Sequence, residues 1–202
     1  MSYSYITGMN FFKKLFSSKG GKNQNEIDEK TSVKEIISTE HFDERYDEGS
    51  ITPEMLDGCL KMIEGFAIDN KIDRKVQYPI NHPLNLDQVV EDGFGFELYC
   101  KALNLGKSES AMFLAYAFSD FLIKLYGFKL FHDKKPEYPL RGMTLKYDRS
   151  GVLLSLYPFE YAVKVLNHEA RFEDLIIRLE SSIKSLPKVD DALKQFLNSY
   201  KA

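Results

Sequence analysis

Hydrophobic positions between residues 53 and 186 recur mostly with the period of an α-helix. The first stretch begins at Thr52 and Pro53, which suit the N-cap and the first helical position, where the missing N–H of proline costs nothing. Apolar residues then follow at helical spacing as far as Ile68. The pattern predicts a helix over about 53–68 and, because of its prolines, a loop over 76–83.

A second helical pattern starts near residue 86 and is apolar over a wide surface that includes Phe94 and Leu98. Such a wide surface predicts deep burial of the whole segment. Gly93 and Gly95 weaken a helix by roughly 1 kcal/mol each relative to alanine. We therefore expect a kink or a close helix approach at these glycines to compensate.

The most apolar pattern of the chain follows and predicts a central helix, with Ser108 as its N-cap and Gly127 as its left-handed C-terminal stop. After Pro158 the spacing favours a helix over 158–166, although a strand over 161–166 is the alternative. An amphipathic helix is predicted over 172–186, ended by Pro187, and a short one over 189–200.

Period-two alternation predicts three short strands between the central helix and residue 157. They cover about 128–132, 143–148 and 152–157. The connection Asp148-Arg149-Ser150-Gly151 suits a tight hairpin, because glycine supplies a positive φ. We predict an α+β fold, in which a helical bundle layer packs on a small antiparallel three-stranded sheet with a hairpin.

The first 50 residues lack these patterns and change sign in charge. Residues 1–22 contain four lysines and no acid, whereas residues 24–48 contain nine acids and three bases. Such a sequence buries too little apolar surface to offset the entropy of ordering. We predict a flexible charged leader over 1–50, basic over 1–22 and acidic over 24–48, and a single α+β globular domain over 51–202.

One segment of the leader has the pattern of a miniature basic amphipathic helix, with apolar residues four apart and lysines flanking them. It makes weak contact with an anionic membrane a hypothesis, with docking in a partner's groove, packing on the protein's own core or a disordered start as alternatives. Met9 is an alternative to Met1 as the native start. The candidate membrane-contact residues are Phe11, Phe12, Lys13, Lys14, Leu15 and Phe16.

Composition is that of an ordinary soluble domain with a tail, since 44% of the 202 residues are hydrophobic and 28% are charged. The net charge of −3 lacks the basic excess that nucleic acid selects. Neither a transmembrane segment nor a secretory signal is predicted, because no apolar run is long enough. Cys59 and Cys100 fall within apolar helical patterns, which favours reduced, buried thiols and a cytoplasmic location.

Residues that carry chemistry do not form a recognisable constellation. Cys100 would be a nucleophile only if folding brought a histidine to it, and its apolar register favours a core thiol. Gly93-Phe94-Gly95 lacks the context of a phosphate loop. We therefore predict no catalytic, cofactor-binding or metal-binding residue and no cofactor. The histidines have no zinc spacing and are His41, His82, His132 and His168.

The loop between the first two predicted strands is the best candidate for recognition. It combines basic and aromatic residues, which suit an acidic partner or ligand, with prolines, although many such loops are simple connections. The candidate partner-binding residues are His132, Lys134, Lys135, Tyr138 and Arg141.

The order of elements and two short motifs resemble a family of small bacterial α+β domains of unknown function, some of them encoded beside toxin or secretion genes. The motifs are Tyr126-Gly127-Phe128 at the end of the apolar helix and Tyr157-Pro158-Phe159 with Lys164 after the hairpin. The resemblance covers roughly 108–186. It departs at Phe128, where the closest relatives would have tryptophan, and at the acidic leader. It implies a bacterial source and a binding role, and transfers no functional residue.

Three functional hypotheses follow from the sequence. The first is a non-enzymatic cytoplasmic protein-binding module whose partner is unknown. One form of this hypothesis is an immunity protein, which binds and neutralises a toxin. The second is an enzyme, a hydrolase, whose site is assembled from Cys100 or a histidine and carboxylates brought together by folding. The third is a peripheral membrane adaptor that uses the basic amphipathic N-terminus.

Overall fold

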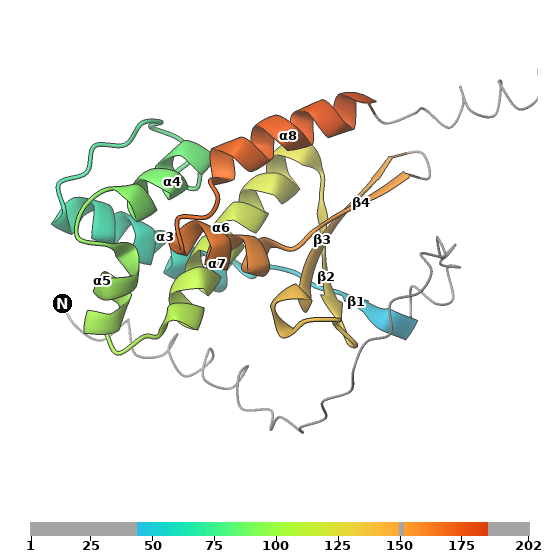
Figure 1. The fold of residues 1–202 in the computed structure, drawn as a ribbon, viewed down its shortest axis with the longest axis horizontal. Helices are drawn as coiled ribbons and strands as arrows, with labels where there is room; N and C mark the ends of the chain where they lie inside the picture. The colour runs from blue at the N-terminus through green and yellow to red at the C-terminus, as the bar shows by residue number, and fades with distance from the viewer. Residues whose placement is uncertain (1–43, 150–151, 186–202) are drawn as a thin grey trace, which may run out of the picture. The chain divides into compact units, whose positions relative to one another are not determined.

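The structure is a computed structural model that describes residues 44–149 and 152–185 (Figure 1). By internal contacts the chain divides into two units, Met1–Arg45 and Tyr46–Ala202, and the elements below belong to the second. The predicted amphipathic segment over 11–16, His41 and the predicted helix over 189–200 lie outside the described residues. Within the described ranges, no helix has both the length and the apolar character needed to cross a bilayer.

The fold is α+β, with four antiparallel strands where the sequence predicted three. The sheet has the order β1-β2-β3-β4. The additional strand, β1, lies at an edge and was missed because three residues, two of them acidic, show no recognisable alternation. It falls in the segment that the sequence analysis placed in the leader. The strands are β1 (Tyr46–Glu48), β2 (Lys129–Asp133), β3 (Met143–Arg149) and β4 (Val152–Leu156).

The register of the sheet places an apolar row across three strands. Leu130 of β2 pairs with Leu145 of β3, which pairs with Leu156 of β4. Leu130 and Leu145 are buried beneath helices that pack on the sheet. Because Arg149 pairs with Val152, the predicted hairpin forms with only two intervening residues. The hairpin that the Asp148–Gly151 connection predicted is therefore present.

Six helices are described in the second unit, and Figure 1 shows most of them beside the sheet rather than around it. Helices α6 and α7 contact β2 and β3, and α3, α5 and α7 pack on α6. Pro158 begins α7 and so resolves the alternative between helix and strand there in favour of a helix. The helices are α3 (Pro53–Asp69), α4 (Pro83–Glu91), α5 (Phe96–Ala102), α6 (Lys107–Tyr126), α7 (Pro158–Leu166) and α8 (Phe172–Ser185).

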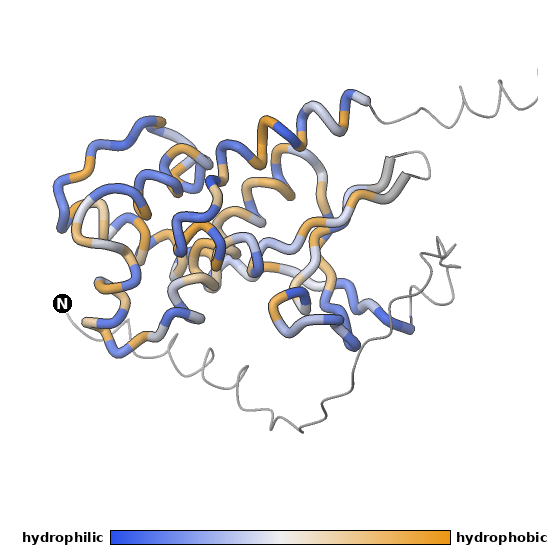
Figure 2. Tube along the Cα trace, in the orientation of Figure 1, coloured by the Kyte–Doolittle hydropathy of each residue, from blue (hydrophilic) through white to orange (hydrophobic). Residues whose placement is uncertain are grey.

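Helix α6 forms the centre of the core, as its apolar pattern predicted. Every residue from Ser110 to Leu122 is buried, and Gly127 ends the helix with a φ of 77°. Its N-cap is Gly106 rather than Ser108, because the Gly106 N–H donates to the carboxylate of Glu109 at 3.0 Å. Figure 2 shows apolar positions recurring along α6, whereas the loop from α3 to α4 is mostly hydrophilic.

Side-chain amides of α4 fasten the loop between α3 and α4. Asn85 accepts from the Val76 N–H at 2.9 Å and donates to the Val76 carbonyl at 2.7 Å. Gln88, one turn further on, accepts from the Lys75 N–H at 3.2 Å and donates to the Asp73 carbonyl at 2.7 Å. The two amides replace the backbone partners that a strand would have provided. The predicted loop is therefore an ordered part of the fold.

A buried carboxylate joins α4 to α8. Asp87 is 1% exposed and accepts from the N–H groups of Phe172 at 2.7 Å and Glu173 at 2.9 Å, at the start of α8. Arg171 Nε lies 3.0 Å from a Glu91 carboxylate oxygen, without the alignment of a hydrogen bond, and 3.8 Å from Asp87. Burial raises the pKa of the Asp87 carboxyl, against the effect of the two N–H donors and Arg171.

Candidate partner-binding surfaces

The predicted recognition loop runs from β2 through a single 3₁₀ turn, Pro139–Arg141, to β3. Its predicted residues do not form one cluster. His132 is on β2, opposite Asp47, and its ring lies so close to Gly49 that a Cβ there would meet Nε2 at 2.6 Å. Lys134 forms an ion pair with Asp47 at 2.8 Å. The backbone N–H of Lys135 donates to the Asp133 carboxylate at 2.9 Å, which turns the chain.

Tyr138 and Arg141 do come together, around a second tyrosine. The Arg141 guanidinium carbon lies 4.9 Å from the ring centre of Tyr138 and 5.0 Å from that of Tyr157. Both distances are within the range of cation–π attraction. Tyr157 stands immediately before α7; the sequence placed it at the end of the third predicted strand and in one motif of the resemblance. The cluster is composed of residues that recur at the centres of protein interfaces.

Two carboxylates hold the guanidinium between these rings. Arg141 Nε donates to Glu160 at 2.7 Å, and its terminal nitrogen donates to Glu137 at 3.1 Å. Glu160 also accepts from Lys164 at 2.8 Å, the i,i+4 pair that the sequence predicted. The hydrogen bonds from Arg141 and then Lys164 lower the pKa of Glu160, and Glu160 in turn raises the pKa of Arg141. Arg141 and its neighbours thus form a neutral, preordered cluster.

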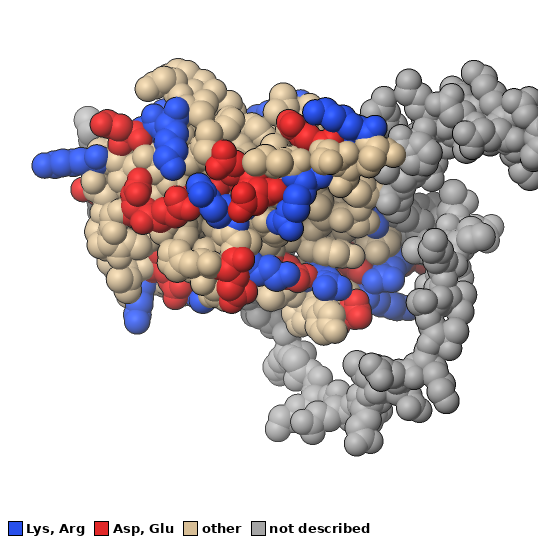
Figure 3. All heavy atoms as spheres, turned by 45° about the horizontal axis from the view of Figure 1, so that its top comes forward, with Lys and Arg blue, Asp and Glu red and all other residues tan. Residues whose placement is uncertain are grey.

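This pairing changes what the loop offers to a ligand. The cluster contains two positive and two negative side chains, and Lys134 is also paired. An anionic ligand at Arg141 would have to displace Glu160 or Glu137, so the loop's basic composition does not translate into a basic surface. On the face drawn in Figure 3, acidic and basic side chains are interspersed in the same way.

A second surface, which the sequence analysis missed, is an apolar hollow between α4, α5 and α7. It has a volume of about 280 Å³. Apolar side chains make up most of its lining, and Glu97 and His168 supply polar groups. The arrangement of an apolar centre with polar groups beside it is that of a protein interface. The lining residues are Val90, Gly95, Phe96, Glu97, Leu98, Leu166 and His168.

Two large apolar side chains of the segment that contributes to the hollow are exposed, contrary to the predicted deep burial of this segment. Phe94 is 56% exposed and Leu98 is 58% exposed. The reason is a break in the helix, because Gly93 and Gly95 adopt φ values of 74° and 100° and separate α4 from α5. The apolar stripe is then interrupted, and only part of it faces the core. The two glycines were the signal for this change of direction, where the sequence predicted a kink or a close helix approach within one continuous helix.

Gly93 also marks a close approach of two segments. A Cβ built there would lie 2.8 Å from Asn70 Oδ1 and 3.1 Å from the Phe66 ring. The Phe66 ring is itself in edge contact with the rings of Phe94 and Phe96, at 5.8 and 5.5 Å. Phe94 is therefore held at its base by the core while more than half of its surface is open to solvent.

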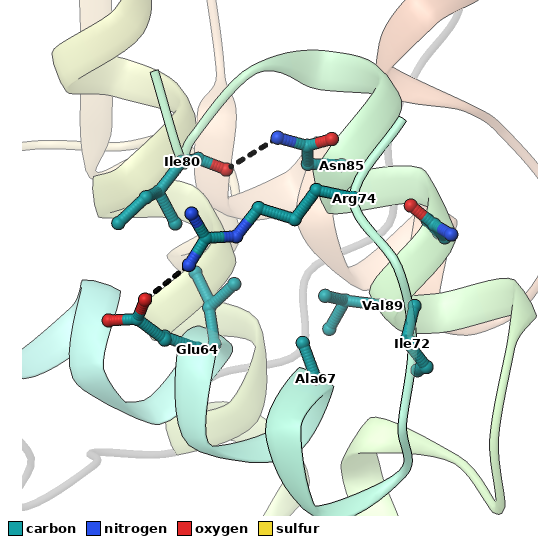
Figure 4. Close-up of a pocket in the computed structure, with 9 residues that line it drawn as sticks. Glu64, Ala67, Ile72, Arg74, Ile80, Asn85 and Val89 are labelled. Atoms are coloured by element: carbon teal, nitrogen blue, oxygen red, sulfur yellow. Dashed lines mark hydrogen bonds and ion pairs between the residues drawn. The ribbon is translucent and has the colours of Figure 1, made fainter. Parts of the chain in front are cut away.

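A smaller cavity lies between α3, the following loop and α4 (Figure 4). Arg74 crosses it to form an ion pair with Glu64, and apolar side chains such as Ile72 and Val89 line its base. The free space is about 10 Å³, close to the minimum that one water molecule requires. Arg74 thus covers the apolar side chains between α3 and α4, and the cavity has no room for an organic ligand.

The two thiols and His82 are explained by packing and capping. Burial raises the pKa of Cys59 to about 12 and that of Cys100 to about 11, so both thiols are protonated and shielded. His82 caps α4 by accepting from the Leu84 N–H, and burial lowers its pKa. In residues 44–149 and 152–185, no three metal-ligating side chains are grouped together.

The comparisons with known proteins return no match. No family model, no curated protein and no solved structure is similar to this chain. The resemblance to small bacterial domains therefore stays a prediction.

Proposed function

We propose that the chain is a protein-binding module that acts in a bacterial cytoplasm by contact rather than by catalysis. The observation that carries the proposal is the apolar hollow, in whose lining Leu98 is 58% exposed, together with the exposed Phe94 just before α5. Large apolar side chains that gather on the surface of a soluble protein mark contact sites, because exposing them to water is unfavourable. A neutralising partner of the immunity kind is the version that the resemblance suggests.

The chemistry of the hollow defines the partner segment. A volume of about 280 Å³ accepts one aliphatic or aromatic side chain, and the exposed Leu98 extends the apolar contact at the hollow. Glu97 and His168 are placed to bond polar groups next to that side chain. The partner is therefore a folded or helical protein surface with one protruding apolar residue and polar neighbours.

The other parts of the proposal have separate support. A cytoplasmic location agrees with two free, buried thiols. The Tyr138–Arg141–Tyr157 cluster is a second, neutral contact surface, and its preordering lowers the entropic cost of binding.

Crosslinking inside the native host tests the proposal directly. A photoreactive amino acid at Leu98 should trap a defined protein, whereas the same group at Lys124, an exposed position of α6, should not. The trapped protein is then purified, and its dissociation constant for the chain is measured by calorimetry. Leu98→Asp should weaken binding at least tenfold, which corresponds to about 1.4 kcal/mol.

The matched control is Ile177→Asp, which changes an aliphatic side chain of α8 that is 61% exposed. Both substitutions lie on the surface and should leave the free energy of unfolding nearly unchanged. Equal affinity of the wild type and Leu98→Asp for the trapped protein, or the same crosslinks from both photoreactive positions, would refute a partner site at the hollow.

A further inference from the structure

The two edges of the sheet differ in how they are protected. At one edge, β1 is three residues long and carries Asp47 and Glu48, which form ion pairs with Lys134 and Lys129. Short length and charge are the features by which proteins keep an edge strand from pairing with another chain. At the other edge, β4 is five residues long and contains no charge, no proline and no bulge.

The backbone of β4 has a partner on one side only. Among residues 44–149 and 152–185, its backbone groups bond to β3 and to no other element. In Figure 1 the far end of the β3–β4 hairpin extends away from helices α6 and α7. The outward N–H and C=O groups of β4 are therefore unpaired within the described ranges, and an extended strand can add to them.

We propose that this edge pairs with β4 of a second copy, antiparallel and about a two-fold axis at Leu154. Leu154 is the central residue of the strand, so residues at equal distances on either side of Leu154 oppose each other across the axis. Leu154 faces its own counterpart, and Leu156 faces residue 152 of the second copy. The result is a continuous eight-stranded sheet.

The composition of β4 suits this occupant. A two-fold axis places identical residues opposite each other at the centre, which is unfavourable for a charged residue and favourable for leucine. Leu156 lies in the apolar row that crosses Leu130 and Leu145, and Leu154 pairs with Tyr147. Pairing about Leu154 continues the same apolar face from one copy into the next, so no polar side chain has to be buried.

Disulfide trapping of the full chain tests the register. In the proposed dimer, the Cα atoms of two Leu154→Cys residues lie about 5 Å apart, which is within the range for a disulfide. Mild oxidation should therefore convert this variant largely to a covalent dimer. The native thiols, Cys59 and Cys100, are buried and do not compete. Sedimentation of the wild type should show a monomer–dimer equilibrium in the micromolar range.

Leu156→Cys is the matched control, because it has the same chemistry two residues along the strand. In the proposed register its two copies lie about 13 Å apart, beyond the reach of a disulfide. Leu154→Glu should shift sedimentation to the monomer while keeping the circular dichroism of the fold. A wild type that remains monomeric at high micromolar concentration, or a Leu156→Cys variant that crosslinks as fast as Leu154→Cys, would overturn the proposal. Neither readout involves the hollow, so this inference and the proposed function can fail independently.

Discussion

Replacing Asp87 with alanine removes the carboxylate that holds the start of α8. Two backbone N–H groups, those of Phe172 and Glu173, lose acceptors at 2.7 and 2.9 Å. Bonds to a charged acceptor contribute about 1.5–3 kcal/mol each. Relief of a buried charge offsets part of this loss, since Asp87 is 1% exposed. We expect Asp87→Ala to lower the free energy of unfolding by about 3 kcal/mol at pH 7.

The pH dependence gives this prediction its sharpest test. Burial raises the pKa of Asp87 above the ordinary 3.8, so the folded protein holds this proton more tightly than the unfolded chain does. The group's contribution to stability is then full below the unfolded pKa and falls as pH rises through the folded pKa. Asp87→Ala lacks this titration. The stability difference between wild type and variant should therefore be larger near pH 4 than at pH 7.

Urea unfolding followed by far-UV circular dichroism at both pH values measures the difference. Asp174→Ala is the control, because Asp174 is an exposed acid in the same helical turn and should cost only about 0.5 kcal/mol through the helix dipole. A wild type–variant difference that shrinks in acid would refute the reasoning. It would mean that the N–H donors and Arg171 outweigh burial, so that the folded pKa of Asp87 lies below its unfolded value.

Four further predictions address other parts of the chain. Gly93→Ala should destabilise the fold by about 1–2 kcal/mol because of the φ of 74° and the contact with Asn70. Gly58→Ala, in open space on α3, should instead stabilise the fold by about 0.5–1 kcal/mol, and equal shifts of the melting temperature in the two variants would contradict this. Glu160→Gln should lower the free energy of unfolding by about 1 kcal/mol at pH 7. This difference should vanish as pH falls through the lowered folded pKa of Glu160, because the stabilisation exists only above that pKa. A difference that persists in acid would argue against the Arg141 bond. Cys59 and Cys100 should resist a thiol reagent at pH 8 until urea unfolds the chain, and rapid labelling of native Cys100 would reopen the hydrolase hypothesis. Liposomes with anionic lipid should float with the full chain and lose it when residues 1–22 are deleted; failure of the intact chain to float would dismiss the membrane hypothesis.

The helices and the hairpin were predictable because their signals are local. Thr52 with Pro53, Gly127, and the alternation around Leu145 each specify an element within a few residues, and the structure confirms all three. The strand β1 was not predictable in this way. It exists because β2 provides a partner more than 80 residues later, and a three-residue pattern contains no record of that pairing.

The candidate surfaces were harder to predict, for a related reason. Arg141 looked like a free cation in a polar loop, but Glu160, 19 residues further on, neutralises it. Phe94 and Leu98 looked buried because a continuous helix was assumed across Gly93 and Gly95. Both errors arise where the direction of a side chain depends on segments that the chain brings together only after folding.

The amide contacts from α4 to the preceding loop make that loop dependent on the helix for its hydrogen-exchange behaviour. The N–H groups of Lys75 and Val76 donate to side chains of Gln88 and Asn85, so they can exchange with solvent only when those amides release them. A stretch without regular secondary structure then exchanges as slowly as a helix. Its protection reports on the opening of α4, and the loop and helix behave as one cooperative unit.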